Sequence, residues 1–118
     1  MNETLVVIPT FNEFENIDPL LKKIFSIRIL VDVLILDDNS PDGTKDEVLK
    51  NINKYKDRLY LICRSEKKGL GKAYIEGFKW ALNKKYKKII QMDADLSHPP
   101  EKIINIVNEL SNYDFVIG

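Results

Sequence analysis

Five short apolar runs, each separated from the next by a longer mixed segment, constrain the fold of this chain more than any other feature. Strands that are apolar throughout are typical of parallel sheets covered by helices on both faces. The alternation of such strands with segments of helical periodicity is typical of α/β domains. We therefore predict an α/β fold with a mostly parallel sheet flanked by helices. The five runs are Leu5–Ile8, Val31–Leu36, Leu59–Cys63, Ile89–Met92 and Phe115–Ile117.

Four helices are predicted between these runs. The first carries apolar residues at helical spacing from Ile17 to Phe25, with Asp18 as its N-cap and Pro19 at the first helical position. The other three are a segment that begins near Thr44, the segment Leu70–Leu82 and a segment opened by Pro99 and Pro100.

Length and composition fit one compact domain, since the chain has 118 residues, of which 44% are hydrophobic and 31% are charged. No apolar stretch approaches the roughly 18–20 residues that cross a bilayer, and no leader peptide is recognisable, so we expect a cytoplasmic protein. The single cysteine, Cys63, lies in an apolar run and is expected to be a buried, inert thiol. The sequence stops at Gly118, where the fifth strand is expected to continue, so we expect residues 1–118 to be part of a longer domain, truncated at its C-terminus.

The formal net charge of zero conceals an uneven distribution of charge. Residues 45–88 hold 14 of the 18 Lys and Arg residues and 5 acids, whereas the rest of the chain holds 4 and 13. A basic segment of this kind attracts nucleic acid, anionic lipid headgroups or a phosphorylated substrate, or it is simply a solvated helix surface. The aromatic side chains that would stack on bases are not interleaved with these lysines, which argues against nucleic acid as a partner.

Asp93-Ala94-Asp95 follows the fourth apolar run and is the strongest chemical signal in the chain. Side chains two residues apart in extended backbone point the same way, so the two carboxylates share a face. Hard cations such as Mg²⁺ bind one or two carboxylates together with the phosphate oxygens of a substrate. The pattern therefore predicts a metal site for a diphosphate, although a solvated loop after a strand has the same composition.

Two further polar clusters follow the first and second runs, and the carboxyl ends of parallel strands form the rim where ligands of such sheets bind. We therefore expect Pro9–Glu13, Asp37-Asp38 and Asp93–Asp95 to line one cleft. Asp38 is the better candidate of its pair for accepting hydrogen bonds from a ribose or nucleobase. Phe11 has the chemistry to stack on a base or to pack as a hydrophobic staple.

Other patterns in the sequence are weaker. Residues 67–73 place glycines and lysines before a helix, which suits a phosphate, but their spacing is not that of a P-loop, and a plain loop fits equally well. His98, the only histidine, has no recognisable nucleophilic partner and is interpreted as a loop residue, with a contact to the metal site as the alternative. Tyr74, Phe78 and Trp80 lie at helical spacings and are interpreted as core residues.

Four motifs occur together and in order, namely Pro9–Glu13, Asp37–Thr44, Gly69–Tyr74 and Met92–Pro99. As a set they resemble the family 2 glycosyltransferases. Within that family the resemblance is to the dolichol-phosphate mannose synthases and the polyprenyl-phosphate glycosyltransferases, and it covers the whole chain. Phe11 stands where the family usually has tyrosine. Its ring can still stack on a base, but it has no hydroxyl to form a hydrogen bond.

The resemblance implies a GT-A fold, of which this chain is the Rossmann-like nucleotide-binding part. It implies a nucleotide-diphosphate sugar as donor, with GDP-mannose favoured, and a polyprenyl phosphate as acceptor, with a membrane surface or a membrane-embedded protein as a further partner. Asp93 and Asp95 become the catalytic residues that bridge Mg²⁺ or Mn²⁺ to the diphosphate. The implied nucleotide-sugar contacts are Pro9, Phe11, Glu13, Leu36, Asp38, Asp93, Ala94 and Asp95.

The function predicted on this basis is metal-dependent, inverting transfer of mannose or glucose to a lipid phosphate, at the cytoplasmic face of a membrane. One alternative is a non-catalytic nucleotide-sugar-binding or assembly module that lacks its acceptor half. A second alternative is a phosphoacceptor signalling domain, which also pairs acids at the ends of parallel strands.

Overall fold

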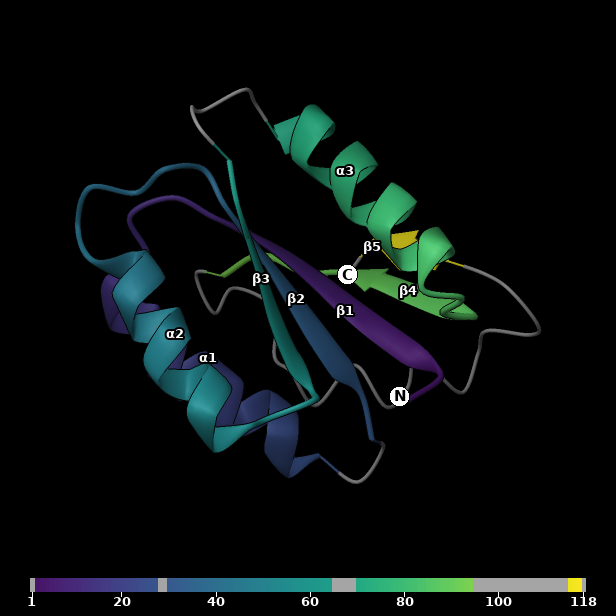
Figure 1. Ribbon diagram of the computed structural model, residues 1–118, viewed down its shortest axis with the longest axis horizontal. Coiled ribbons are helices and arrows are strands. Elements are labelled where there is room, and N and C mark those ends of the chain that lie inside the picture. Colours follow the sequence, from purple (N-terminus) through teal and green to yellow (C-terminus); the bar gives the residue numbers. More distant parts are fainter. Residues whose placement is uncertain (1, 28–29, 65–69, 95–114, 118) are drawn as a thin grey trace.

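A computed structural model describes residues 2–27, 30–64, 70–94 and 115–117 of the chain (Figure 1). The elements follow one another in the order strand, helix, strand, helix, strand, helix, strand, strand. Their bounds are β1 (Thr4–Thr10), α1 (Phe14–Ser26), β2 (Asp32–Asp37), α2 (Thr44–Lys54), β3 (Leu59–Cys63), α3 (Leu70–Asn83), β4 (Lys88–Gln91) and β5 (Phe115–Ile117).

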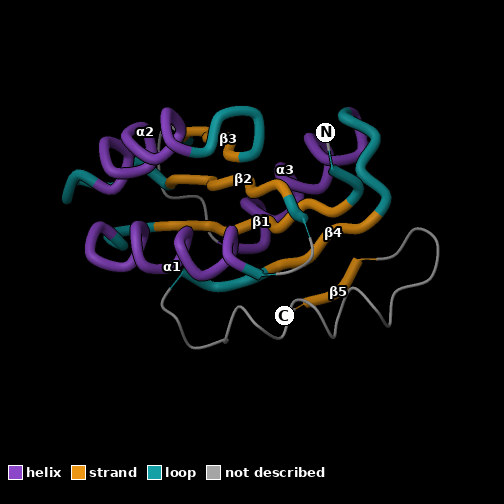
Figure 2. Tube along the Cα trace, turned by 90° about the horizontal axis from the view of Figure 1, so that it is seen from below, coloured by secondary structure: helices purple, strands orange, loops and turns teal. Residues whose placement is uncertain are grey.

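The strands form one sheet in the order β3-β2-β1-β4-β5, and every neighbouring pair is parallel. Figure 2 shows β3 and β5 at opposite edges of the sheet, with β1 between β2 and β4. The order reverses at β1, because the chain places β2 and β3 on one side of it and then returns to add β4 on the other. This topology confirms the predicted α/β fold, and it makes the carboxyl end of β1 the switch point at which ligands of such sheets bind.

Helices cover both faces of the sheet, with α1 and α2 on one side and α3 on the other (Figure 1). The core under α1 and α2 joins Ile17, Leu20 and Ile24 to alternate strand residues such as Val6 and Ile35, all fully buried. The core under α3 takes the other set of strand residues. Because both sets are buried, the strand runs are apolar at nearly every position, as is typical of a doubly covered parallel sheet, and Asp32 in β2 is a buried exception. The second core contains Leu5, Val7, Leu34, Leu36, Ala73, Ala81, Tyr86 and Ile89.

The first strand continues through Pro9 to Thr10, whereas the sequence analysis ended the apolar run at Ile8. The Val7 carbonyl accepts a hydrogen bond from Met92 N–H on the β4 side, and the Thr10 carbonyl accepts one from Asp38 N–H on the β2 side. Along a strand, the backbone N–H and C=O groups of successive residues point alternately to one neighbouring strand and to the other. The position of the missing N–H of Pro9 therefore faces the β4 side, beyond the last residue of β4. Proline is therefore tolerated in a central strand without loss of a ladder bond.

The predicted start of the first helix at Asp18 and Pro19 is wrong, because α1 begins at Phe14 and holds Pro19 in its interior. Its first N–H groups are capped from a distant loop: Glu13 N–H donates to Thr44 Oγ1 at 3.0 Å and Phe14 N–H donates to Asp42 Oδ2 at 3.2 Å. This cap comes from residues about thirty positions away, so no local pattern at residues 13–18 reveals it. Asp18 instead forms an ion pair with Lys22 at 3.2 Å.

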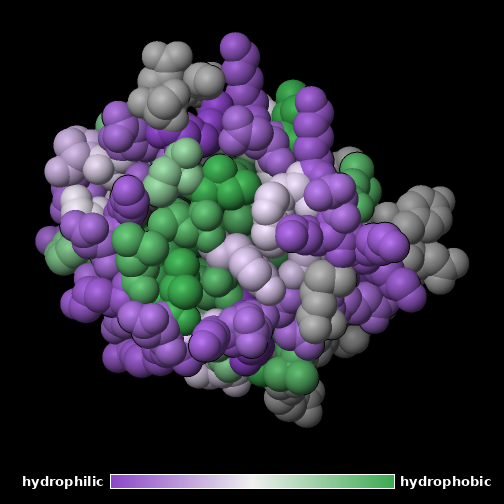
Figure 3. All heavy atoms as spheres, in the orientation of Figure 1, coloured by the Kyte–Doolittle hydropathy of each residue, from purple (hydrophilic) through white to green (hydrophobic). Residues whose placement is uncertain are grey.

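The prediction that Cys63 is buried is also wrong, since this residue is exposed. It ends β3, which lies at the edge of the sheet, where Leu61 and Ile62 are only half buried and Leu49 of α2 is 43% exposed. Figure 3 shows apolar side chains on the surface over β3 and beside α2. Partial desolvation still raises the pKa of the Cys63 thiol, so the residue stays in its unreactive, protonated form at neutral pH.

The remaining sequence-based boundaries agree closely with the structure where the structure describes the chain. The second helix begins at Thr44, and the runs at residues 59–63 and 115–117 are strands with the predicted bounds. The third helix ends at Asn83, and β4 starts one residue earlier than predicted. The helix predicted after Pro99 and Pro100 lies outside the described residues.

Gly77 allows α3 to approach the sheet closely, because a Cβ atom added there would lie 2.7 Å from Val7 Cγ1 and 3.1 Å from Leu36 Cδ1. We expect Gly77→Ala to lower the free energy of unfolding by about 1–2 kcal/mol, since overpacking outweighs the better helix propensity of alanine. Gly71→Ala is the matched control, because nothing lies within 4 Å of its added Cβ. Urea unfolding of both variants tests this, and a Gly77→Ala variant as stable as Gly71→Ala would contradict the close contact.

Candidate functional site

The ends of β1, β2 and β4 meet at one rim of the sheet. Thr10 lies opposite Asp37 in the register of β1 and β2, and Val7 lies opposite Gln91 in that of β1 and β4. Asp93 follows Gln91 by two residues, so it comes level with Pro9. The three polar clusters that the sequence analysis placed at strand ends are therefore neighbours in space, as far as the structure describes them.

The two adjacent acids at the end of β2 have different partners. Asp37 is 1% exposed, and its carboxylate accepts hydrogen bonds from Thr10 Oγ1 at 2.7 Å, Ser40 Oγ at 2.6 Å and Ser40 N–H at 3.0 Å. These bonds join the end of β1 to the loop after β2. Asp37 is therefore held within the fold by three hydrogen bonds, and the preference of the sequence analysis for Asp38 as the ligand-binding acid stays a prediction.

The loop after β2 also holds the loop after β1 in place. Asn12 N–H donates to Ser40 Oγ at 2.9 Å, next to the two bonds that cap α1 from Thr44 and Asp42. Asn12 and Asn39 both have positive φ values, of 56° and 57°, a conformation that asparagine adopts more readily than most residues. The hydrogen bonds that Asp42 receives hold the pKa of its carboxyl below its usual range, against the opposing effect of desolvation.

The residues in these loops that are predicted to contact the nucleoside differ in the solvent exposure of their side chains. Phe11 is 37% exposed, while Pro9 and Glu13 are half buried. Glu13 Oε2 accepts a hydrogen bond from Asn16 Nδ2 at 2.8 Å, and both residues line a hollow of about 260 Å³ beside Asn12 and Asp42. The side chain of Leu36, by contrast, is fully buried in the core under α3, so any contact of Leu36 with a nucleoside involves its main chain.

Asp93, the first acid of the predicted metal pair, is half buried at the rim, and Ala94 beside it is 3% exposed and packs in the core under α1 and α2. The hydroxyl of Tyr74 on α3 faces the Asp93 carboxylate closely enough for the two groups to interact. Burial, followed by the negative charge of Asp93, raises the pKa of Tyr74 to about 12, so the hydroxyl stays protonated as a donor. Tyr74, interpreted from the sequence as a core residue, thus lies beside a candidate metal ligand.

Carboxylate oxygens are the ligands that Mg²⁺ and Mn²⁺ prefer, and a ligating carboxylate is usually fixed by an outer hydrogen bond. The donor chemistry at Asp93 therefore fits the predicted cation. Asp95, His98 and residues 67–69 lie outside the described residues. Within the described ranges, no group of three or more His, Cys, Asp and Glu side chains is arranged to hold a metal ion by itself.

The sequence analysis missed one charged residue at the rim, Arg64, which follows β3 directly. Its Nη1 lies 3.1 Å from Asp38 Oδ1, and the two side chains are 2% and 8% exposed. On its other side, Arg64 Nε lies 3.7 Å from Oε2 of Glu76 on α3. The signal was present in the sequence, because Arg64 follows an apolar run just as the acids at the other strand ends do.

Comparison with known proteins agrees with this arrangement. The family model described as "Glycosyl transferase family 2" matches residues 5–118. The chain belongs to glycosyl transferase family 2. This membership confirms the resemblance drawn from the ordered motifs, and it speaks against a phosphoacceptor signalling domain.

Three proteins of similar sequence are named as a mannose synthase or as mannosyltransferases. The chain is 38% identical over 116 residues to a polyprenol monophosphomannose synthase of Mycolicibacterium smegmatis, and 39% identical over 115 residues to an undecaprenyl-phosphate mannosyltransferase of Micrococcus luteus. It is 37% identical over 116 residues to a dolichol-phosphate mannosyltransferase of Pyrococcus furiosus. These matches cover 98%, 97% and 96% of this chain but only 44%, 46% and 32% of the three relatives, so the chain spans less than half of their length.

A solved structure shares the fold of this glycosyl transferase family 2 chain. It is the mannosyltransferase PcManGT from Pyrobaculum calidifontis in complex with GDP-Man and Mn²⁺, with a TM-score of 0.76 and 24% sequence identity. The similarity covers 86% of this chain and 30% of that protein. At this identity the comparison supports the arrangement of strands and helices and nothing finer. In the part of this chain that the structure describes, no helix is long and apolar enough to cross a membrane.

Proposed function

We propose that this chain forms the donor- and metal-binding part of a metal-dependent, inverting glycosyltransferase. The proposed reaction moves mannose or glucose from a nucleotide-diphosphate sugar, with GDP-mannose favoured, to a polyprenyl or dolichyl phosphate. The single observation that carries this proposal is the meeting of Asp38, Asp93 and the loop after β1 at the switch point of a family 2 sheet. On this proposal residues 1–118 are the nucleotide-sugar-binding part of a GT-A domain.

The nucleoside is assigned to the rim between β1 and β2. Phe11 exposes its ring, which suits stacking on a base, and Asp38 supplies acceptor oxygens for ribose or base N–H and O–H groups. Pro9 and Glu13 border the same rim, and Leu36 contributes through its main chain. The bonds from Ser40, Asp42 and Thr44 to the loop after β1 hold these groups in place before the ligand arrives.

The diphosphate end is assigned to Asp93, Ala94 and Asp95, with Asp93 and Asp95 as the residues that hold Mg²⁺ or Mn²⁺. A cation held there neutralises negative charge on the departing nucleoside diphosphate. Tyr74 keeps the Asp93 carboxylate oriented, as an outer-shell partner of a metal ligand does. A lipid phosphate acceptor is already anionic, so its attack on the sugar needs little help from a general base.

Calorimetric titration of GDP, UDP and their mannose and glucose conjugates, with and without Mn²⁺, tests the proposal directly. We expect GDP and GDP-mannose to bind in the presence of Mn²⁺ and to bind at least about tenfold more weakly without it. Asp95→Ala is expected to abolish the dependence on metal. Binding that is independent of metal, or that survives Asp95→Ala unchanged, would contradict the assignment of the site.

A non-catalytic module that binds a nucleotide sugar is the second candidate, because the chain spans less than half of its named relatives. The two candidates differ in turnover. A glycosyltransferase converts GDP-mannose and a short polyprenyl phosphate into GDP and a mannosylated lipid, whereas a binding module retains GDP-mannose without releasing GDP. The release of GDP, measured with and without the lipid phosphate, separates the two.

The outer face of α3 is proposed as the surface that lies on the cytoplasmic face of a membrane holding the acceptor lipid. Lys72 and Lys79 alternate there with Ile75 and Leu82, which are 54% and 68% exposed. These four residues recur at spacings of three and four, so they share one face of the helix. Exposed apolar groups flanked by lysines are typical of helices that lie on anionic lipid.

We therefore expect the protein to co-sediment with vesicles that contain phosphatidylglycerol, and to do so less in high salt or with vesicles of phosphatidylcholine alone. The double variant Ile75→Ser, Leu82→Ser is expected to weaken this binding about tenfold, because two aliphatic side chains no longer enter the lipid. Leu49→Ser is the matched control, since Leu49 is exposed on α2 on the opposite face of the sheet. Equal binding by the α3 and α2 variants would contradict the orientation.

A further inference from the structure

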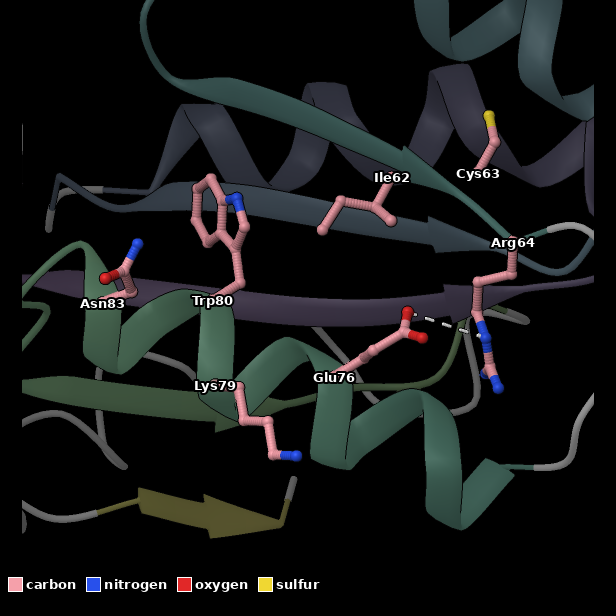
Figure 4. Close-up of a pocket in the computed structure, with 7 residues that line it drawn as sticks. All are labelled: Ile62, Cys63, Arg64, Glu76, Lys79, Trp80 and Asn83. Atoms are coloured by element: carbon pink, nitrogen blue, oxygen red, sulfur yellow. Dashed lines mark ion pairs between the residues drawn. The ribbon is translucent and has the colours of Figure 1, made fainter.

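Arg64 stands between two carboxylates at the end of β3. The backbone N–H of Arg64 donates to the Asp37 carbonyl at 2.7 Å, which fixes the start of the side chain beside the end of β2. From there the guanidinium reaches Asp38 at 3.1 Å and Glu76 at 3.7 Å. Figure 4 shows Arg64 and Glu76 approaching each other from the end of β3 and from α3, on the right-hand side of a groove. Three elements of the fold thus meet at one cation.

The two ion pairs differ in burial, and this difference sets their importance. Arg64 and Asp38 have side chains that are 2% and 8% exposed, whereas the Glu76 side chain is 47% exposed. A buried carboxylate without a cation is strongly unfavourable, while an ion pair near water contributes little. The Arg64–Asp38 pair is therefore the one that the fold depends on, and Glu76 is an outer contact.

We infer that Arg64 is a positioning residue for donor binding, which holds the Asp38 carboxylate in the orientation that receives the nucleoside. This inference rests on the proposed function, because it assigns Asp38 to the nucleoside. Arg64 contacts Oδ1 of Asp38, and a carboxylate can accept several hydrogen bonds, so this ion pair is compatible with hydrogen bonds from ribose or base donors. A planar guanidinium fixes direction as well as charge, which a lysine ammonium does not.

Arg64 also borders a groove between β3 and α3. The groove has a volume of about 720 Å³ and is lined by Ile62 and Cys63 of β3 and by Lys79, Trp80 and Asn83 of α3, in addition to the ion pair (Figure 4). Arg64 closes the end of this groove that lies nearest to Asp38. The guanidinium thus lies between α3 and Asp38, and it acts on the ligand only through that carboxylate.

A double-mutant cycle tests the inference. GDP and pyrophosphate, each with Mn²⁺, are titrated into the wild-type chain and into Arg64→Met, Asp38→Asn and the double variant. We expect Arg64→Met to weaken GDP binding about ten- to hundredfold and to leave pyrophosphate binding within about twofold, because pyrophosphate probes only the metal end of the site. In the Asp38→Asn background, Arg64→Met is expected to have an effect below about threefold, since the pair acts as one unit.

Two further variants keep the test independent of folding. Arg64→Lys retains the charge and is expected to recover part of the GDP affinity lost in Arg64→Met, and it replaces Arg64→Met in the cycle if that variant does not fold. Glu76→Gln removes only the exposed contact and is expected to change GDP binding less than about twofold.

Three outcomes would overturn the inference. The first is a folded Arg64 variant that binds GDP like the wild type, and the second is an Arg64 effect that is equally large with and without the Asp38 carboxylate. The third is equal weakening of GDP and pyrophosphate, which marks a general structural role. Failure of the wild-type chain to bind GDP at all would overturn the proposed function together with this inference, whereas the first three outcomes leave the proposed function intact.

Discussion

Asp93→Asn is expected to reduce the Mn²⁺-dependent affinity for GDP by at least about a hundredfold. Outer-shell partners of a metal ligand typically contribute ten- to a hundredfold in affinity, and the loss of a ligand itself costs no less. Asparagine has the shape of aspartate, and its carbonyl can accept a hydrogen bond from Tyr74, so the substitution removes charge without removing the side chain. Isothermal titration with GDP at fixed Mn²⁺, and with Mn²⁺ at fixed GDP, measures the effect on both ligands.

Two further variants are compared with Asp93→Asn, one with an expected intermediate effect and one as the control. Tyr74→Phe removes the donor but keeps the Asp93 carboxylate, so it is expected to weaken Mn²⁺-dependent binding by about tenfold, less than Asp93→Asn. Asp46→Asn removes an exposed acid in the first turn of α2 and is expected to leave binding unchanged. If Asp93→Asn bound GDP and Mn²⁺ as well as Asp46→Asn, the metal assignment would be wrong.

The sheet could be predicted from the sequence because each strand contains an apolar run that is visible in its own residues. The bounds of β3 and β5 follow directly from continuous apolar runs, and parallel pairing follows from burial on both faces. The shared rim then follows from topology alone. Pro9 shows the limit of this reasoning, because its tolerance inside β1 depends on where the neighbouring strand β4 ends, which the residues around Pro9 do not encode.

The start of α1 and the network around Asp38 could not be predicted because both depend on contacts between residues far apart in the sequence. Thr44 and Asp42 cap a helix that begins at Phe14, and this distant cap prevails over the local signal of Asp18 and Pro19. Asp37 and Asp38 are adjacent and chemically identical, yet one bonds Thr10 and Ser40 while the other pairs with Arg64. Only the packing of β1 and β3 on either side of β2 distinguishes them.

Arg64 and Tyr74 share a property that explains why residue type alone did not reveal them. Each contacts a carboxylate at the rim from an element other than the one that carries it, Arg64 from the end of β3 and Tyr74 from α3. A positioning residue can be identified only once the residue that it contacts is known, whereas a ligand-binding residue can be identified from the chemistry of its own side chain. The sequence therefore pointed to the acids at the rim and not to the groups that orient them.

At the opposite end of the sheet, Tyr86→Phe is expected to lower the free energy of unfolding by about 1.5–3 kcal/mol, the usual contribution of a hydrogen bond to a charged group. The Tyr86 hydroxyl donates to Asp32 Oδ2 at 2.5 Å, and the Asp32 side chain, which is fully buried, also accepts a 2.7 Å bond from Asn2 Nδ2. Phenylalanine leaves this buried carboxylate with one donor fewer. Thermal unfolding followed by circular dichroism measures the loss, and Tyr55→Phe, which keeps its ring stacked on Phe25, is the control.

The same bond makes a prediction for alkaline pH. Burial, and then the hydrogen bond to Asp32 and its charge, raise the pKa of Tyr86 above its usual value near 10. Since the folded state holds this proton more tightly than the unfolded state, its contribution is complete below about pH 10 and declines as the pH rises toward the folded-state pKa. The wild-type protein should therefore lose stability between about pH 10 and pH 12 more steeply than Tyr86→Phe, which has no such proton to lose. Parallel losses in the two proteins over that range would show that the phenol does not bind its proton more tightly in the folded state.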